Sequence, residues 1–241
     1  MAGPWSNVPA TWKRRALRAK HWRARSWPGH TLHWGSFRRT TPMSDRFGLD
    51  RGLPIDRFYI GEFVGRHRDD IRGAVMEVSR PTYVEQFGSP TTVTVIDIDP
   101  ANAQATLIAD LCEPASLPRE AFDCIVLTQT LQYLRDLGAA IENLWSALAP
   151  GGVLLMTVPA VSRDDPRGAD YWRFTPAGLD VALRTALPDD ASITVSGYGN
   201  VLGAVAMLHG LSVEETGRDA LAVDDVMYPV VACARVVRGA R

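Results

Sequence analysis

Apolar segments of strand length alternate with segments of helical periodicity through the middle of this chain, and that alternation limits the choice of fold. Strands are predicted at residues 75–78, 92–98, 106–109, 123–128 and 153–158, with a final pair at 192–196 and 230–237. A helix is predicted at 56–69, and one or two helices at 131–148, which end at the turn APGG. Strands separated by helices pair in parallel, in a sheet that helices cover on both faces. The pattern predicts a doubly wound α/β domain with roughly seven strands.

The charges are unevenly distributed along the 241 residues. Residues 1–44 hold nine of the 26 basic residues and none of the 27 acidic ones, so residues 45–241 carry 17 basic charges and a net charge near −10. We therefore divide the chain into a basic Trp/Arg-rich N-terminal arm, residues 1–44, and a domain, residues 45–241. Opposite net charges make these two parts attract each other, within one chain or across a homodimer.

A basic amphipathic helix is predicted within this arm, over residues 9–26. Trp12 and Trp22 lie along one face of it, which favours docking on the domain or on a partner subunit. Its arginines also allow contact with an anionic surface such as a membrane. We find no firm signal for nucleic-acid binding, because nothing else in the chain supports it.

The three cysteines indicate the compartment. Cys124 and Cys233 fall in apolar strand patterns, and with Cys112 they form neither a disulfide framework nor a metal-site spacing. No apolar run approaches the roughly 20 residues that cross a bilayer. We expect reduced thiols and a cytoplasmic protein without a bound metal.

Polar residues follow the first four predicted strands. In sheets of this kind ligands bind beyond the carboxyl ends of the strands, near the point where strand order reverses. Three acidic ends followed by a neutral one favour a ligand with an adenosine end and a reactive end that avoids negative charge. Each acid taken alone is better explained as a helix N-cap or as a residue of a solvated loop, and it is the four strand ends together that favour the ligand. The residues are Glu77 and Ser79, Asp97 and Asp99, Asp110 and Leu111, and Thr128 and Gln129.

Several motifs carry a family resemblance. The segment FDCIVLTQTLQYLRDLGAAIENLWSALAPGGVLLMTVP, residues 122–159, resembles the fourth strand, connecting helix and fifth strand of class I S-adenosylmethionine-dependent methyltransferases. DRGLPIDRFYI, DYWRFT and the tail segments YGN, LHG and YPV resemble a bacterial branch of that family often found beside or fused to glycosyltransferases. The resemblance covers roughly residues 42–238.

This resemblance implies a seven-stranded mixed sheet in the order 3-2-1-4-5-7-6, with strand 7 antiparallel. It also implies S-adenosylmethionine held across strands 1 and 2. Carried over by position, Glu77 begins the first motif, Asp97 binds the ribose with Asp99 as the fallback, Asp110 and Leu111 face the adenine, and Thr128 and Gln129 line the methionine portion.

The turn after Glu77 departs from the family pattern. Where the family has a glycine-rich turn, this chain has Ser79-Arg80-Pro81-Thr82-Tyr83, although the bacterial branch shares a glycine-poor turn. Only glycine lets a ligand approach the backbone without a Cβ in the way, so the methionine end needs other partners. Arg57 and Tyr59 are our candidates, because an arginine can bind a carboxylate bidentately. A salt bridge within a lid is an equal alternative for them.

The acceptor side has its own candidates. His209 and Asp170 are potential general bases, and Tyr133 and Tyr171 could orient an acceptor. Trp172 and Arg173 would suit a sugar or polyketide-like acceptor. Structural hydrogen bonding for the histidine, and lid packing for Trp172 and Arg173, are the alternatives.

Three functions are consistent with these residues. The first is an O-methyltransferase acting on a sugar, glycan precursor or secondary metabolite. Only the analogy with the glycosyltransferase-associated branch suggests a sugar as the acceptor. The second is a methyltransferase-fold cyclase or other natural-product enzyme that transfers no methyl group. The third is a non-catalytic binding protein.

Overall fold

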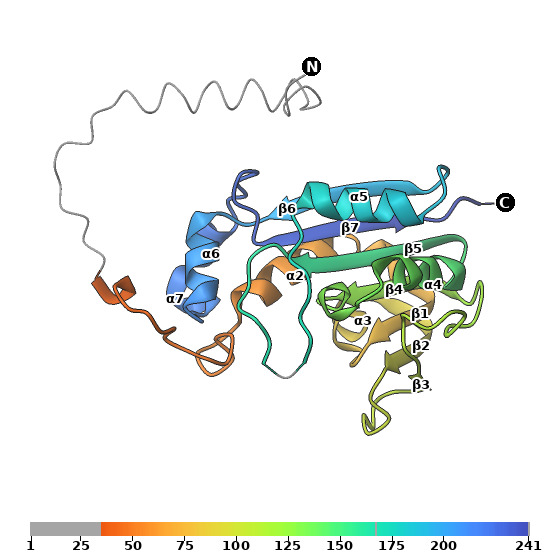
Figure 1. Cartoon of the computed structure of the whole chain (residues 1–241), viewed down its shortest axis with the longest axis horizontal. Coiled ribbons are helices and arrows are strands. Elements are labelled where there is room, and N and C mark those ends of the chain that lie inside the picture. Colours follow the sequence, from red (N-terminus) through yellow and green to blue (C-terminus); the bar gives the residue numbers. More distant parts are fainter. Residues whose placement is uncertain (1–34, 167, 241) are drawn as a thin grey trace, which may run out of the picture. The chain divides into compact units, whose positions relative to one another are not determined.

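The computed structural model describes residues 35–166 and 168–240, so the helix predicted over 9–26 lies outside the described residues (Figure 1). From Thr41 onward the chain forms one compact unit. Its sheet contains β1 (Arg72–Val78), β2 (Ser89–Asp97), β3 (Leu107–Ile108), β4 (Phe122–Thr128), β5 (Leu148–Pro159), β6 (Ser192–Tyr198) and β7 (Val231–Val237). The helices are α2 (Ile55–Arg66), α3 (Thr82–Phe87), α4 (Leu137–Ala147), α5 (Pro176–Ala186), α6 (Val201–Leu208), α7 (Val213–Thr216) and α8 (Arg218–Leu221). Short 3-10 turns are η1 (Gly35–Phe37), η2 (Arg68–Asp70) and η3 (Leu131–Tyr133).

The seven strands lie in the order β3-β2-β1-β4-β5-β7-β6. Strand β1 pairs in parallel with β2 and with β4, whereas β7 runs antiparallel to both β5 and β6. The predicted order and the antiparallel seventh strand are therefore confirmed. Strand order reverses at β1, so the carboxyl ends of β1, β2 and β4 flank the point where ligands bind in such sheets.

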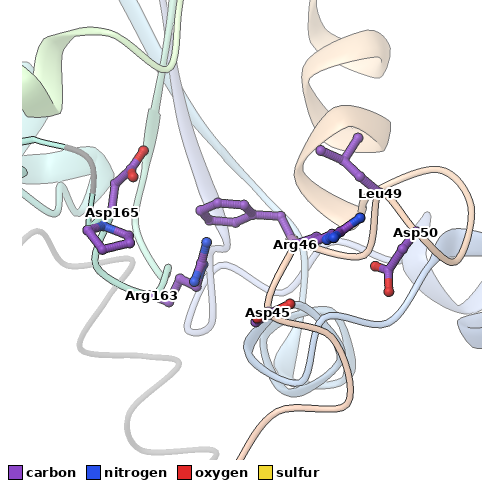
Figure 2. A pocket seen from close by; sticks show the side chains of 8 residues that line it. Asp45, Arg46, Leu49, Asp50, Arg163 and Asp165 are labelled. Atoms are coloured by element: carbon purple, nitrogen blue, oxygen red, sulfur yellow. The ribbon is translucent and has the colours of Figure 1, made fainter.

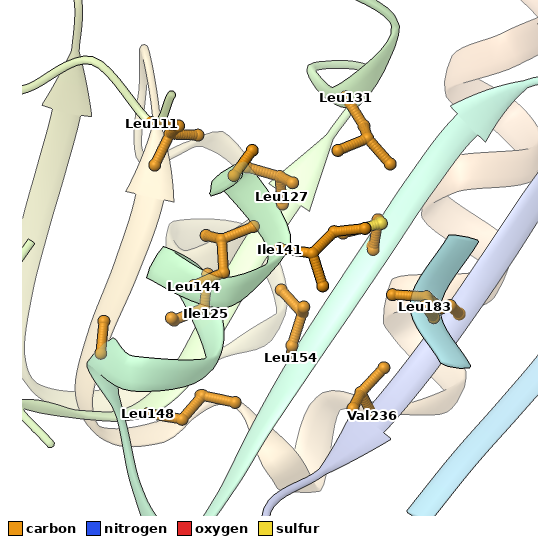
Figure 3. Close-up of a cluster of buried hydrophobic side chains, with 14 of the residues drawn as sticks. Leu111, Ile125, Leu127, Leu131, Ile141, Leu144, Leu148, Leu154, Leu183 and Val236 are labelled. Atoms are coloured by element: carbon orange, nitrogen blue, oxygen red, sulfur yellow. The ribbon is translucent and has the colours of Figure 1, made fainter. Parts of the chain in front are cut away.

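Helices cover both faces of the sheet (Figure 1). Alternate residues of β4 enter opposite cores: Ile125 packs in a first cluster that includes residues of α4 and α5, and Cys124 packs in a second that includes residues of α2 and α6. Figure 3 shows the first cluster, with Ile141 of α4 facing the strands. Cys233 of β7 is likewise buried in the second cluster, as its strand pattern predicted.

Several element boundaries differ from the predictions, and contacts explain two of the differences. The helix predicted over 56–69 ends at Arg66 and continues as η2, where Asp70 receives two hydrogen bonds from Arg235 of β7, at 2.7 and 2.8 Å. This ion pair holds the turn against the sheet. The strand predicted from 153 begins directly after α4, because Leu148 already pairs with Phe122 of β4.

Capping residues fix other helix starts. Asp136 accepts a hydrogen bond from Ala139 N–H at 3.0 Å at the start of α4, and Thr175 does the same for Gly178 at the start of α5. Within the described ranges, every helix is too short or too polar to cross a membrane.

Candidate cofactor and acceptor site

The turn after β1 is tight although it lacks glycine. Ser79 adopts the left-handed conformation with φ +67°, and its N–H donates to Ile96 O at 2.8 Å. A left-handed backbone costs a non-glycine residue about 1–2 kcal/mol, so the surrounding contacts must hold this turn in place. One such contact comes from Asn102, whose side-chain amide donates to Ser79 O at 2.8 Å.

Glu77 is fully engaged by the start of α3. The side chain is 2% exposed, and its carboxylate accepts hydrogen bonds from Tyr83 N–H at 3.0 Å and from Val84 N–H at 2.9 Å. Burial raises the pKa of Glu77 to about 7, although the two backbone donors oppose the shift. Glu77 thus fastens the glycine-poor turn to the helix that follows it.

Asp97 at the end of β2 is an ionised acceptor. Its carboxylate accepts hydrogen bonds from Asp99 N–H at 3.0 Å and from the Asn102 amide at 2.7 Å. Burial alone would raise the pKa of Asp97, but these hydrogen bonds outweigh it and the pKa is lowered. Asp99 instead turns its carboxylate to Ala101 N–H at 2.9 Å, in a local loop contact. Of the two, Asp97 is the better match to the hydroxyls of a ribose, and its assignment stays a prediction.

The two residues predicted to face an adenine point to different environments. Asp110 is half-buried and accepts a hydrogen bond from Cys112 N–H at 2.8 Å. Leu111 is 5% exposed and packs in the first core cluster (Figure 3), with its carbonyl bound by Asn143 at 2.8 Å. Most of the Leu111 side chain is therefore buried in the core, and little of its surface is left to contact an adenine.

Three buried polar side-chain atoms without a hydrogen-bond partner in the described chain belong to residues at or just after the ends of β4 and β5. Gln129, with φ +48°, donates its N–H to Thr157 O at 2.8 Å, and its carbonyl accepts from the Gln132 amide at 2.9 Å. The atoms left without a partner are Gln129 Nε2, Gln132 Oε1 and Thr157 Oγ1. Such atoms usually mark a place that water or a ligand completes. Together with Asp97, they fit a polar cofactor across this edge of the sheet, near the predicted Thr128 and Gln129.

Arg57 lies between the turn after β1 and η3. Its Nη1 donates to Tyr83 Oη at 3.3 Å, and its side chain remains 45% exposed. Burial alone would lower the pKa of this guanidinium, but Asp56 and the phenols of Tyr83 and Tyr133 raise it overall. A half-exposed cation at this place can still bind a carboxylate.

Tyr59 does not join Arg57. It is 1% exposed in the second core cluster, and its hydroxyl lies against Gly203 of α6. Burial, followed by the charge of Asp224, raises the pKa of Tyr59 to about 12. Tyr59 follows Arg57 by two residues on α2, about 200° around the helix, so it faces the core instead of the cleft.

The predicted acceptor residues of the DYWRFT segment hold a loop together. Asp170 and Arg173 form a paired ion contact, with Arg173 Nη2 2.7 Å from Asp170 Oδ2. Trp172 Nε1 donates to Leu134 O at 2.9 Å, and Arg135 lies over the ring of Tyr171 at 5.7 Å. All four predicted residues therefore bind loop or η3 neighbours, and Asp170 has its carboxylate committed to Arg173.

His209 also has a structural position. It caps the end of α6, and its carbonyl accepts hydrogen bonds from Met43 N–H at 2.8 Å and Ser44 N–H at 3.2 Å. These bonds attach the leading loop, which we define as residues 42–54, to the end of α6. His209 as a general base stays a prediction.

A pocket of about 460 Å³ opens between this leading loop and the loop that joins β5 to α5 (Figure 2). Asp165, 5% exposed, contributes to its wall and accepts a hydrogen bond from Tyr133 Oη at 3.2 Å. Tyr133 in turn lies near Arg57, so polar groups connect the turn after β1 with the pocket. The lining residues are Asp45, Arg46, Phe47, Leu49, Asp50, Arg163, Asp165 and Pro166.

The sequence analysis missed Asp165 and Arg163. The only signal was the charged run SRDDPRGAD directly after an apolar strand, which does not say which of its carboxylates turns inward. The structure selects Asp165 and leaves its neighbour Asp164 exposed.

Known proteins share this fold. The family model of a methyltransferase domain matches residues 73–182. Solved structures with similar folds include the cyclase SpnF, at 16% identity and TM-score 0.52 over 77% of this chain and 82% of that one. An S-adenosylmethionine-dependent methyltransferase from Mesorhizobium loti has 16% identity and TM-score 0.51, over 76% and 98%. Another from Thermotoga maritima, described as a possible histamine N-methyltransferase, has 14% identity and TM-score 0.52, over 76% and 91%. No curated protein matches the sequence significantly.

The chain has the class I methyltransferase fold. The match to the methyltransferase-domain model supports a methyltransferase with S-adenosylmethionine as its cofactor, and the solved structures show the same fold. Because a cyclase shares this fold, the fold alone does not specify the reaction.

Proposed function

We propose that this protein is an S-adenosylmethionine-dependent O-methyltransferase acting on a small hydroxylated acceptor, such as a sugar, glycan precursor or secondary metabolite. The observation that carries the proposal is the buried Asp165, a residue of the pocket wall whose carboxylate accepts a hydrogen bond from Tyr133. A hydroxyl must lose its proton as its oxygen gains a carbon, and a nearby carboxylate can accept it.

Each residue of the site has a role in this proposal. S-adenosylmethionine supplies an electrophilic methyl group when it is bound. Asp97 accepts hydrogen bonds from ribose hydroxyls, and Arg57 binds the methionine carboxylate in place of a glycine-rich turn. Burial, followed by the charge of Asp165, raises the pKa of Tyr133, so its phenol stays protonated at neutral pH and keeps Asp165 in place. The residues chiefly supply alignment.

The test is methyl transfer from labelled S-adenosylmethionine to a panel of carbohydrates and hydroxylated metabolites. We expect Asp165→Asn to lower kcat by about 100-fold, the lower range for loss of a general base, with S-adenosylhomocysteine affinity nearly unchanged. Asp164→Asn is the matched control, because that neighbour is exposed. Equal rates for Asp165→Asn and the wild type would remove Asp165 as the base. Conversion of an acceptor to an isomer of unchanged mass would favour the cyclase alternative instead.

A further inference from the structure

Among the charged residues that line the pocket, Arg163 is the one with a buried side-chain nitrogen that has no hydrogen-bond partner in the described chain. The Asp50 carboxylate accepts a hydrogen bond from Ser44, and the charge of Arg46 acts on it as well. Asp165 is bound by Tyr133. By contrast, no carboxylate in the described part of the chain forms an ion pair with Arg163, and its Nε is buried without a hydrogen-bond acceptor there.

An aromatic ring fixes the position of this guanidinium. The Arg163 Cζ lies 4.0 Å from the centre of the Phe47 ring, in a cation–π contact. Phe47 itself adopts the left-handed conformation, with φ +58°. Strained residues of this kind persist where the surrounding structure enforces them, and they are concentrated at ligand sites.

The backbone that presents Phe47 is held at several points. Arg46 N–H donates to Ser44 Oγ at 3.1 Å, Leu49 N–H donates to Arg46 O at 3.0 Å, and Ser44 N–H binds His209 O. Figure 2 shows Arg163 and Asp165 projecting from one loop and Arg46, Leu49 and Asp50 from the other. The cation is therefore oriented before any ligand arrives, which lowers the cost of binding.

We propose that this pocket selects a ligand that carries an anionic group, a carboxylate or a phosphate, and that Arg163 binds this group. The inference rests on the proposed function in one respect, because it assigns the ligand to the acceptor. The anion lies on Arg163 and a hydroxyl of the same molecule faces Asp165, two residues along the loop. A planar guanidinium matches the oxygens of both anions, and desolvation by the pocket wall strengthens the contact.

The experiment measures binding, so it does not depend on turnover. Glucuronate, glucose 6-phosphate and neutral glucose are titrated into the full chain and followed by ligand-observed NMR. We expect at least one anionic probe to bind about tenfold more tightly than glucose, since a hydrogen bond to a charged group is stronger than one to a neutral group. Whichever probe is preferred shows whether the group is a carboxylate or a phosphate.

Variants assign the preference to Arg163. Arg163→Gln should abolish the difference between anionic probe and glucose, and Arg163→Lys should retain part of it. Arg184→Gln, an exposed arginine of α5 paired with Asp180, should keep all of it. Unfolding midpoints of the variants are compared with the wild type, and the lysine variant keeps the test valid if the glutamine variant fails to fold.

Equal binding of glucose and both anionic probes to the wild type, or no binding of either anionic probe, would overturn the inference. The inference would also be overturned if Arg163→Gln still preferred the anionic probe to glucose. Methyl transfer to a neutral acceptor without any preference for anions would overturn this inference and leave the proposed function standing. Selective binding of the anionic probes without methyl transfer to any acceptor would overturn the proposed function and leave this inference standing.

Discussion

Glu77 and Asp97 are acidic residues at the ends of neighbouring strands, yet their surroundings separate their roles. Glu77 is enclosed and binds two backbone donors of α3, whereas Asp97 remains partly exposed beside Asn102. The sequence placed both at a cofactor site. The sequence could not show that backbone N–H groups at the start of α3 donate hydrogen bonds to the carboxylate of Glu77.

Substitution of Asp97 tests the ribose assignment. We expect Asp97→Ala to weaken S-adenosylhomocysteine binding by at least tenfold, because an ionised acceptor is lost. Asp99→Ala is the matched control, since within the described residues the Asp99 carboxylate accepts a hydrogen bond only from the local Ala101 N–H. Isothermal titration calorimetry gives both affinities. Equal losses in the two variants would show that Asp97 has no particular role.

The raised pKa of Glu77 predicts a pH-dependent stability. The folded state holds a proton up to a pKa of about 7 that the unfolded state releases near 4.5. The free energy of unfolding should therefore fall as pH rises from about 5 to about 7, by up to about 3 kcal/mol. Urea unfolding across this range should give a flatter profile for Glu77→Gln than for the wild type. Parallel profiles for the two proteins would contradict the prediction.

Arg57 can be tested with two ligands that differ in the methionine portion. S-adenosylhomocysteine contains a carboxylate that adenosine lacks. We expect Arg57→Gln to lower affinity for S-adenosylhomocysteine about tenfold and to leave adenosine affinity nearly unchanged. The comparison separates a contact with the carboxylate from a general disturbance of the site. If both ligands lose affinity equally, Arg57 acts only on the structure of the cleft.

At the scale of elements, the leading loop is attached to the end of α6 and to α7. Leu53 N–H donates to Glu214 at 3.0 Å, Arg51 pairs with Glu215, and Pro54 forms a bridge with Ser212. These contacts join the motif DRGLPID to residues 212–215, which follow the motif LHG and lie about 160 residues further along the chain. The motifs were evident in the sequence, whereas this contact depends on the tertiary fold.

A glycine pair tests this attachment. Gly210 has φ +67°, and a Cβ there would collide with the carbonyl of Ser44. Gly217 has φ +92° with open space around it. We expect Gly217→Ala to cost about 1 kcal/mol from backbone strain alone, and Gly210→Ala to cost about 2 kcal/mol or more. Chemical unfolding measures both, and equal costs would mean that the loop adapts easily.

The strands of the sheet were predictable because each one is marked by a short apolar run in the sequence itself. Each strand is an apolar run such as CIVL at 124–127, and the alternation of runs fixes the class of fold. The order of strands came from the family resemblance. The pocket was not predictable, because Tyr133–Asp165 and Phe47–Arg163 join residues far apart along the chain. Neither pair has a periodicity or a spacing that a single sequence displays.

At the scale of the whole molecule, the charge asymmetry remains the main feature outside the site. Residues 1–40 hold nine basic and no acidic residues, so without them the net charge changes from −1 to about −10. Every described residue to which we assign a role in binding or catalysis lies in the remaining compact unit, which begins at Thr41. Cofactor binding and the charged N-terminal arm should therefore be separable.

Deletion of residues 1–40 tests this separation. We expect affinity for S-adenosylhomocysteine to change less than about twofold, because screening at physiological salt weakens electrostatic effects beyond about 8 Å. Calorimetry measures the affinity, and light scattering after size exclusion measures the mass. A change from dimer to monomer with intact affinity would assign the arm to assembly through its opposite charge. Loss of folding would instead make the arm part of the architecture of the domain, because the compact unit that begins at Thr41 would then not be stable without it.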